Sequence, residues 1–420
     1  MKNNMISFMG GSVWGNRGAE AMLMTSMARI LRFSPGAQFN IYSIYPKEDS
    51  KLVSKPNIHF YSGEPLSVAL VHFPFALLYW LFKRIRITLP LPKPLAALKN
   101  SDCLLDIGGI TFSDGRTVQL LYNVLTILPA YLLGVPIIKM SQATGPFRTS
   151  INKRLAKHIL PLCQKIFSRG YLSSNYLDQL LGPGNYFQAA DIAFLFNAED
   201  SLSVENEDKV AEVVDFLKRK RGASTLVVSV APSSLVLKKS LRKGIDYPGR
   251  LLNLLLATQD RNIHFIYLPN GSRQASTEIM NNDIIAIQAV RQTFTRELPH
   301  ELLDRVTWID YDINTRGVRD LIAQTDLLIT SRFHAMIAGL SLCVPTMVIG
   351  WSHKYRETLQ DFQMAEFAID YQHESVQITR LFLKALTNLE EMKVMLQSHL
   401  SNVKQSSLIQ FNYLQEFLNL

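Results

Sequence analysis

Short apolar runs and longer amphipathic segments alternate along the first half of the chain. Runs of this length are typical of buried strands, and the segments between them carry apolar residues at helical spacing. The expected strands are residues 4–9, 38–44, 102–107, 136–140 and 164–168, and the expected helices are residues 17–32, 118–133, 149–161 and 172–181. This alternation predicts an α/β fold with mainly parallel sheets.

The same alternation starts again after a charged and polar stretch at residues 200–222, which has a short helical pattern around Val210 to Lys218. The strands expected beyond it are residues 225–230, 263–268, 305–309, 326–330 and 344–349. A chain of 420 residues is also too long for a single core. We therefore predict two Rossmann-like domains facing a cleft, an N-terminal domain at residues 1–200 and a C-terminal domain at residues 221–375, with closing helices at residues 376–420.

Residues 67–86 interrupt this alternation. The run from Ser67 to Phe82 is apolar and aromatic, and the basic cluster Lys83-Arg84-Ile-Arg86 follows it. The run is short for a bilayer span, which needs about 20 residues, and it contains Pro74. Two interpretations stay open: a peripheral membrane contact whose cations bind anionic lipid, or a hydrophobic hairpin inside the first domain.

The charge balance narrows the choice of partners. The composition, 47% hydrophobic and 19% charged, is that of a globular protein. A formal net charge of +9 favours acidic partners such as phosphate compounds, anionic lipid head groups or nucleic acid. Basic and aromatic residues do not alternate as in a nucleic-acid groove, so we expect no nucleic acid partner.

The three cysteines indicate whether the protein binds a metal. Cys103, Cys163 and Cys343 are far apart in apolar runs, so we expect buried reduced thiols. Their spacing matches no zinc motif, and no metal is expected.

Residues 1–5 lead directly into a strand with no secretory signal, which predicts a cytoplasmic location.

The stretch from Thr325 to Gly350 carries the most informative chemistry. It has the pattern of a strand, a turn with Ser331 and Arg332, a helix of small residues that begins near His334, and a second strand. Open α/β sheets bind ligands at the carboxyl ends of their strands, and a guanidinium beside a helix N-terminus favours a phosphorylated anion. Arg332 is expected in the turn and His334 in the first helical turn, with Thr330 or Ser331 as N-cap. A structural histidine packed on the neighbouring domain is the alternative.

Further strand-end turns carry glycines, amides or cations. They contain Asn16 and Arg17, Asp106 with Gly108 and Gly109, Gln142 with Gly145, Arg169, and Lys354. Each has a plain structural interpretation as well, since Asp caps turns, Gly-Pro makes turns and single arginines are usually solvated. Their convergence on carboxyl-edge positions in both halves is what favours a ligand site.

On these motifs the chain resembles the polysaccharide pyruvyl transferase family. The matching pieces are Gly15-Asn16-Arg17-Gly18-Ala19-Glu20-Ala, Asp106-Ile-Gly108-Gly109, Gln142-Ala-Thr-Gly145-Pro146, Ser168-Arg169 with Ser173, Ala190-Asp191-Ile-Ala-Phe194, and Asp326 through Pro345 with Lys354. The resemblance implies a GT-B-like fold. It also implies transfer of pyruvate from phosphoenolpyruvate onto two sugar hydroxyls, with a cyclic ketal and inorganic phosphate as products.

The resemblance also implies roles for individual residues. Arg332 and His334 are expected to be catalytic and to bind the donor. Arg169, Ser331 and Lys354 complete the donor site. The residues expected to bind the acceptor or to line the cleft are Asn16, Arg17, Asp106, Gly108, Gly109, Gln142 and Gly145. No metal or cofactor is implied besides phosphoenolpyruvate as co-substrate.

Two positions depart from the family pattern. Gly170 stands where the family often has Asp, and the turn Leu268-Pro-Asn-Gly271 stands where it often has His. Because of these departures, the resemblance does not specify which sugar is the acceptor. The chemistry itself fits the residues, because addition of a hydroxyl to the enol carbon requires protonation of the neighbouring CH₂, and His334 is the candidate acid.

The sequence leaves the acceptor and two rival functions open. The acceptor is a sugar of a cell-surface polysaccharide (an exopolysaccharide) or of its polyprenyl-linked precursor, the latter placing the protein at the inner face of the cell membrane. One rival is a GT-B glycosyltransferase that uses a nucleotide sugar. The other is a non-catalytic, membrane-associated protein of glycan assembly.

Overall fold

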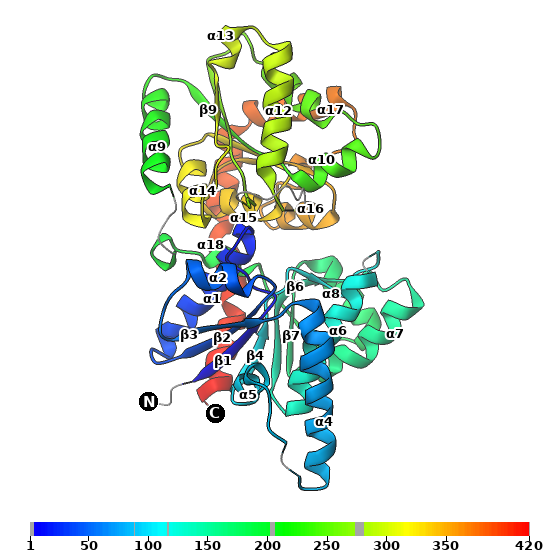
Figure 1. Ribbon diagram of the computed structural model, residues 1–420. Coiled ribbons are helices and arrows are strands. Elements are labelled where there is room, and N and C mark those ends of the chain that lie inside the picture. The colour runs from blue at the N-terminus through cyan, green and yellow to red at the C-terminus, as the bar shows by residue number, and fades with distance from the viewer. Residues whose placement is uncertain (1–3, 88, 116, 202–205, 274–280, 420) are drawn as a thin grey trace. The chain divides into compact units, whose positions relative to one another are not determined.

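The computed structural model describes residues 4–87, 89–115, 117–201, 206–273 and 281–419, which form two compact α/β units (Figure 1). Unit 1 comprises Met1–Trp14, Ala19–Asp200 and Lys404–Leu420. Unit 2 comprises Gly15–Gly18 and Ser201–Val403. The boundary therefore falls at Asp200, and both ends of the chain belong to unit 1.

Unit 1 is built on one parallel sheet. Its strands are β1 (Met5–Met9), β2 (Gln38–Ser43), β3 (Ile58–Ser62), β4 (Cys103–Asp106), β5 (Ile110–Thr111), β6 (Ile137–Thr144), β7 (Lys165–Ser168) and β8 (Phe187–Gln188). The order across the sheet is β3-β2-β1-β4-β6-β7-β8, with β5 paired to β6. Its helices are α1 (Arg17–Phe33), α2 (Pro46–Leu52), α3 (Pro65–Ser67), α4 (Phe73–Arg84), α5 (Lys93–Lys99), α6 (Thr117–Leu133), α7 (Ser150–Ile159) and α8 (Tyr171–Leu181).

Unit 2 has a second parallel sheet, of six strands. They are β9 (Leu226–Ala231), β10 (Ile263–Tyr267), β11 (Val306–Trp308), β12 (Leu327–Thr330), β13 (Thr346–Gly350) and β14 (Ala368–Asp370), in the order β11-β10-β9-β12-β13-β14. Its helices are α9 (Glu207–Gly222), α10 (Ser234–Leu241), α11 (Tyr247–Leu256), α12 (Asp283–Glu297), α13 (His300–Leu303), α14 (Thr315–Ile322), α15 (Phe333–Ser341), α16 (His353–Gln360), α17 (Ser375–Thr387) and the first half of α18 (Leu389–Asn419).

Both sheets reverse their strand order once. In unit 1 the reversal lies between β1 and β4, and in unit 2 it lies between β9 and β12. At such a point the connections leave toward opposite faces of the sheet and open a crevice at the carboxyl edge, where α/β proteins bind ligands. The central strands β4, β6 and β12 are buried throughout, as expected of parallel strands covered by helices on both faces.

Most elements expected from the sequence are present, and the differences lie at the edges of the sheets. The expected strands match β1, β2, β4, β6, β7 and β9 to β13 within a few residues. Pattern analysis missed β3, β5, β8 and β14, which are short or lie at a sheet edge. Helix α9 packs Val210 and Leu217 into the core of unit 2. The charged stretch at residues 200–222, which separates the two predicted domains in the sequence, is therefore largely part of unit 2.

The hydrophobic hairpin considered for residues 67–86 is wrong. Pro65 to Arg84 form one continuous helical segment, in which a π-helical turn at Val68–His72 links α3 to α4. The Phe73 amide donates to the Val68 carbonyl, five residues back, directly before Pro74. A wider turn at this point makes room for the ring of Pro74, which explains why the helix continues through the proline instead of turning back as a hairpin.

The end of α18 anchors the C-terminus within unit 1. The Gln410 side chain accepts the Ser141 amide at 3.0 Å and donates to the Ala190 carbonyl at 3.2 Å. Ser407 donates to the Asp191 carbonyl at 3.0 Å. Residues 404–420, predicted as part of the closing helices, thus belong to the first unit.

The three cysteines are free thiols, as expected, but only Cys103 is fully buried. Cys163 and Cys343 are half-buried, so the expectation of burial is wrong for these two.

Two buried histidines make the stability of both units pH-dependent. Burial lowers the pKa of His72 in unit 1, and of His264 in unit 2, from 6.5 to about 4. The folded protein therefore stays neutral at these sites where the unfolded chain takes up protons, so the free energy of unfolding falls as pH drops from 6.5 toward 4. We expect His264→Gln to flatten this dependence in urea melts compared at neutral pH and at about pH 5. The matched control is His300→Gln, at a fully exposed histidine, which should keep the wild-type slope. Equal slopes for both variants would contradict the assignment.

Candidate functional site

The turn from β12 into α15 lies at the strand-order reversal of unit 2. The Ser331 amide donates to the Ala231 carbonyl at the end of β9 at 3.0 Å, so this turn and the start of α10 are held together. Arg332 lies in the turn and His334 is the second residue of α15, as the sequence predicted. The expected N-cap is wrong: Arg332 occupies that position, and the Thr330 hydroxyl accepts the Arg332 amide at 2.9 Å.

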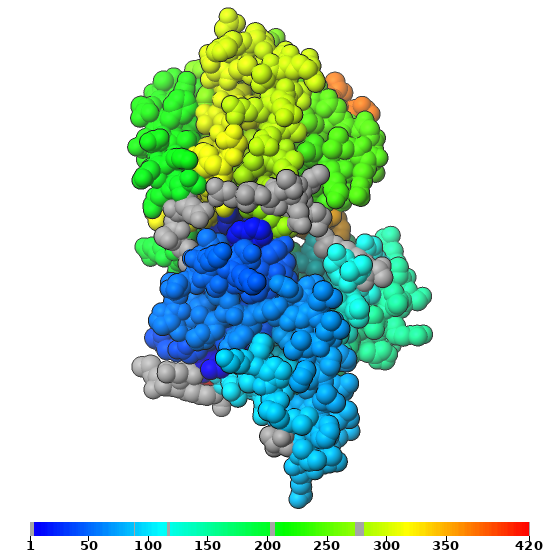
Figure 2. All heavy atoms as spheres, viewed as in Figure 1, coloured from blue at the N-terminus to red at the C-terminus, as the bar shows by residue number. Residues whose placement is uncertain are grey.

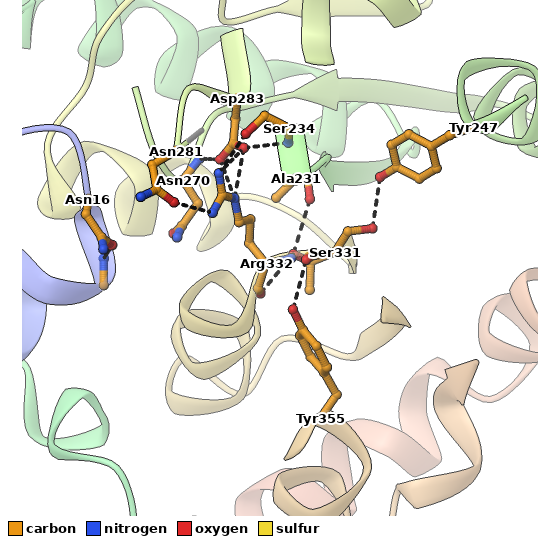
Figure 3. A network of polar contacts seen from close by, with 12 residues as sticks. Asn16, Ala231, Ser234, Tyr247, Asn270, Asn281, Asp283, Ser331, Arg332 and Tyr355 are labelled. Atoms are coloured by element: carbon orange, nitrogen blue, oxygen red, sulfur yellow. Dashed lines mark hydrogen bonds and ion pairs between the residues drawn. The ribbon is translucent and has the colours of Figure 1, made fainter. Parts of the chain in front are cut away.

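The Arg332 guanidinium is held by the carboxylate of Asp283 (Figure 3). Nε donates to both carboxylate oxygens, at 2.8 and 2.7 Å, and Nη2 makes a further short bond to Oδ1. Nη2 also lies 3.2 Å from Ser234 Oγ, and Nη1 lies 3.4 Å from Asn281 Oδ1. The side chain of Arg332 is 16% exposed, whereas that of Asp283 is fully buried. The guanidinium is therefore held on its buried side, and part of it stays accessible to solvent.

Asp283 itself begins α12 and is anchored by backbone amides. It accepts the Ser234 amide at 3.0 Å and the Asn270 amide at 3.2 Å. These amides come from the residues that follow β9 and β10. One carboxylate therefore connects the residues that follow β9 and β10 to Arg332, which lies in the turn after β12.

Ser331 and the two tyrosines around it support the turn. The Ser331 hydroxyl lies 2.8 Å from that of Tyr247, and the Tyr355 hydroxyl donates to the Ser331 carbonyl at 3.0 Å (Figure 3). Burial raises the pKa of Tyr247 to about 12, so its phenol stays protonated. Ser331 is buried, and its hydroxyl is engaged in this packing; its expected contact with the donor stays a prediction.

His334 and Lys354 both lie beside the Phe333 ring. The rings of Phe333 and His334 meet edge to face at 5.3 Å, and Lys354 Nζ lies 4.5 Å from the centre of the Phe333 ring. A Cβ on Gly18 would come within 2.0 Å of His334 Nδ1, so the chain passes directly against the imidazole there. The expected role of Lys354, as a positive charge at the donor site, stays a prediction.

The segment Gly15–Gly18 clusters with unit 2 and is held by Arg17. Arg17 Nη2 forms an ion pair with Asp312 at 2.5 Å, and its carbonyl accepts the Thr315 hydroxyl at 2.8 Å. Asn16 caps the segment, since its side chain accepts the Gly18 amide at 3.2 Å. Arg17 is buried in this pairing, so its role in the structure is to hold the glycine segment; an acceptor contact stays a prediction.

Asp106 is the centre of a polar network at the carboxyl edge of unit 1. It forms a buried ion pair with Lys139 at 2.5 Å, and its other oxygen accepts the Gln142 side chain at 2.7 Å and the Gly108 amide at 3.0 Å. The Thr111 hydroxyl donates to Gln142 at 2.9 Å. Of the predicted cleft residues, Asp106, Gly108 and Gln142 are brought together here, and the contacts of Asp106 match the capping interpretation.

Two of the remaining predicted glycines have close neighbours. Gly145 has a φ of +77°, and a Cβ there would come within 2.6 Å of the Tyr176 ring, so only glycine fits. The Gly109 carbonyl accepts Arg169 Nη2 at 2.6 Å.

Arg169 is also paired with a carboxylate. Its Nη1 makes a short ion pair with Asp191, and both side chains are buried. Asp191 in turn accepts the Ala193 amide at 2.9 Å. The two arginines expected at the donor site therefore share one arrangement, a guanidinium oriented by a buried carboxylate at the end of a parallel strand.

Sequence reasoning missed several residues around these arginines. Asp283 and Asp191 hold the guanidinium groups, and Lys139 pairs with Asp106. A pocket of about 350 Å³ at the start of α16 was also missed; its lining includes Trp351, His353, Arg356, Asp370 and His373. Asp283 had a readable signal, since an Asp that follows two Asn residues before an amphipathic stretch is typical of a helix start. In the described part of the chain, no group of three or more His, Cys, Asp or Glu side chains is arranged to hold a metal ion.

Comparison with known proteins decides the family. Residues 16–353 match the polysaccharide pyruvyl transferase family. The chain belongs to this family. The family prediction is thereby confirmed, and a pyruvyl transferase acting on a polysaccharide is the activity that membership indicates. The matched region contains Arg169, Arg332 and His334 and nearly all of both sheets.

Solved structures place this pyruvyl transferase family member in the GT-B fold. UDP-GlcNAc 2-epimerase from Neisseria meningitidis, bound to UDP-GlcNAc, aligns with a TM-score of 0.57 and 12% identity over 99% of this chain and 100% of that one. UGT71G1 from Medicago truncatula, complexed with UDP-glucose, gives 0.56 and 11% over 99% and 98%. Alr3699/HepE from Anabaena, in complex with UDP-glucose, gives 0.54 and 12% over 99% of each chain. At this identity the likeness concerns the fold alone, and it confirms the GT-B-like prediction.

Loss of the Asp283 carboxylate should destabilise the protein strongly. Asp283→Asn leaves a guanidinium and two buried amides without their charged acceptor, and we expect the free energy of unfolding to fall by about 2–4 kcal/mol. Denaturant melts measure this. The control is Asp310→Asn, which breaks the exposed pair of Asp310 with Arg291 and should cost about 0.5 kcal/mol or less. Similar losses for the two variants would contradict the role given to Asp283.

The close approach of Gly18 to His334 predicts a coupled pair of substitutions. Gly18→Ala places a methyl group where the imidazole lies, and we expect it to lower the free energy of unfolding by about 1–3 kcal/mol. In a His334→Ala background the same substitution should cost far less, because the ring is gone. A double-mutant cycle from denaturant melts measures the coupling. A coupling energy near zero would show that the two residues do not touch.

Proposed function

We propose that the protein transfers pyruvate from phosphoenolpyruvate to two hydroxyls of one sugar in a cell-surface polysaccharide or its lipid-linked precursor. The observation that carries the proposal is Arg332, fixed by Asp283 at the strand-order reversal of unit 2, within a chain of the polysaccharide pyruvyl transferase family. A guanidinium held in this way needs little reorganisation to receive a carboxylate or phosphate.

The donor subsite consists of the Arg332 turn, the N-terminus of α15 and Lys354. Phosphoenolpyruvate is small and highly charged, so its recognition requires several cations and amides in one place. Arg332 presents its partly exposed guanidinium, and Lys354 adds a point charge 4.5 Å from the neighbouring Phe333 ring. Amides at the start of α15 favour the same anion.

The reaction has two steps that balance with the residues named. In the first, His334 donates a proton to the CH₂ carbon of phosphoenolpyruvate, which becomes a methyl group, and a sugar hydroxyl adds to the enol carbon and returns its proton to the imidazole. In the second, the bond from that carbon to the phosphate oxygen breaks, the second hydroxyl takes the place of the phosphate, and its proton leaves with the phosphate. The products are a cyclic ketal and inorganic phosphate, and Arg332 stabilises the charge on the leaving phosphate.

The proposed acceptor contacts are those that the family resemblance implied. They come from Asn16 and Arg17 of unit 2 and from the strand-end loops of unit 1 with Asp106, Gly108, Gly109, Gln142 and Gly145, while Arg169 keeps its role toward the donor. The ion pairs of Asp106 and Arg169 support a rigid set of loops there. We place the reaction in the cytoplasm, at the inner face of the cell membrane, with no metal or further cofactor.

Steady-state kinetics test the roles of Arg332 and His334 separately. With a glycan acceptor, wild-type protein should release phosphate and increase the acceptor mass by pyruvate less one water. Arg332→Lys removes the planar fork, and we expect kcat/KM for phosphoenolpyruvate to fall about 100-fold. His334→Gln removes the acid, so kcat should fall by about 100-fold or more with little change in KM.

A control variant separates these effects from general damage to the protein, and two results would contradict the proposal. Arg291→Lys, at an exposed arginine of the same unit, should leave both constants unchanged. A His334→Gln variant that keeps kcat and raises KM would assign the imidazole to donor binding. Thermal stabilisation by UDP or GDP sugars, with no effect of phosphoenolpyruvate, would instead favour a glycosyltransferase and overturn the proposal.

A further inference from the structure

The helical segment Pro65–Arg84 has one buried and one exposed apolar face. The buried face is formed by Val68, His72, Ala76 and Tyr79, which recur every three or four residues. Ala76 and Tyr79 belong to the core of unit 1, together with Leu120 of the neighbouring helix α6. The segment is therefore an integral part of unit 1 rather than an appendage.

The opposite face carries large aliphatic side chains that the structure leaves uncovered. Leu66, Leu70, Leu78, Leu81 and Ile85 are 72, 68, 43, 46 and 63% exposed. Their spacing places them along one stripe of the helix, turned away from the buried face. We call these five residues the aliphatic stripe. Figures 1 and 2 show that the C-terminal half of α4, to which Leu78 and Leu81 belong, projects from unit 1.

The charged residues of the segment that carries the stripe have one sign after Glu64, which is exposed at its N-terminal end. Between Glu64 and Asp102 the sequence has no acidic residue, and its five charged residues are Lys83, Arg84, Arg86, Lys93 and Lys99. Between Asp114 and Asp178 there is again no acidic residue, while eight are basic. That stretch includes α7, which packs beside α6 and exposes Lys153, Arg154 and Lys157. At the projecting end, Arg84 stacks on Trp80 at 3.7 Å, a pairing suited to the level of lipid head groups.

We propose that the aliphatic stripe and its cations dock unit 1 onto an anionic lipid bilayer. The aliphatic side chains enter the interface, while Lys83, Arg84 and Arg86 bind the head groups. A stripe whose projecting half is flanked by cations is matched to a fluid, negatively charged surface rather than to a protein groove. This inference does not depend on the proposed chemistry.

Docking at the interface also fits better than crossing the bilayer. By length and composition Pro65–Arg84 is the one described helix that passes as a membrane span, with a mean hydropathy of 1.7. Its inner face, however, packs in the core of unit 1. Insertion across the membrane would expose that core, whereas surface docking uses only the side chains already exposed.

Vesicle flotation of the full-length protein tests the proposal. Vesicles that contain phosphatidylglycerol should carry the protein, vesicles of phosphatidylcholine alone should carry far less, and alkaline carbonate should release it. Leu78→Ser with Leu81→Ser should reduce binding at least about tenfold. Lys83→Gln with Arg84→Gln should reduce binding to the anionic vesicles about 30-fold, the effect of two charges near the surface.

The control pair Val376→Ser with Val394→Ser changes residues of unit 2 that are 66 and 63% exposed, and it should bind like wild type. Equal binding by all variants, or none by wild type, overturns the proposal. Resistance to carbonate would make the segment a bilayer span. Dimers in sedimentation that dissociate with Leu78→Ser and Leu81→Ser would assign the stripe to a second copy of the chain. None of these readouts uses turnover, so failure here is separate from failure of the pyruvyl transfer proposal.

Discussion

The ion pair between Arg332 and Asp283 is the interaction on which the site of unit 2 depends. Asp283 accepts amides from the residues that follow β9 and β10, and it binds the guanidinium of Arg332 in the turn after β12. A buried carboxylate of this kind contributes little to net stability compared with apolar packing, but removal of either partner is costly. The carboxylate fixes the orientation of the guanidinium, whose Nη1 and Nη2 also lie near Asn281 and Ser234.

The same solution recurs in unit 1. Arg169 is oriented by Asp191, and Lys139 is neutralised by Asp106, in each case at the end of a parallel strand. Such charges are expensive to bury unless they are paired and hydrogen-bonded, and here each has both. Both strand-end sites thus combine cations with the low dielectric that makes their interaction with an anion strong.

The sequence predicted what short-range patterns determine. Apolar runs located ten strands, and the Ser331-Arg332-Phe-His334 block placed Arg332 before the helix and His334 inside it. Short-range patterns do not predict contacts between residues far apart in the sequence. Asp283 precedes Arg332 by 49 positions, and only the fold brings them together. The short edge strands carry too few residues for a pattern. The N-cap was missed because the Thr330 hydroxyl accepts the Arg332 amide instead of capping the helix itself.

A crystal structure of the protein with phosphoenolpyruvate bound is the most direct test of the central claim. We predict phosphate or carboxylate oxygens within hydrogen-bonding distance of Arg332 Nη1 or Nη2 and near Lys354, with the contacts between Arg332 Nε and Asp283 intact. An anion bound away from the β12–α15 turn, or a complex in which Arg332 touches no ligand atom, would contradict the account.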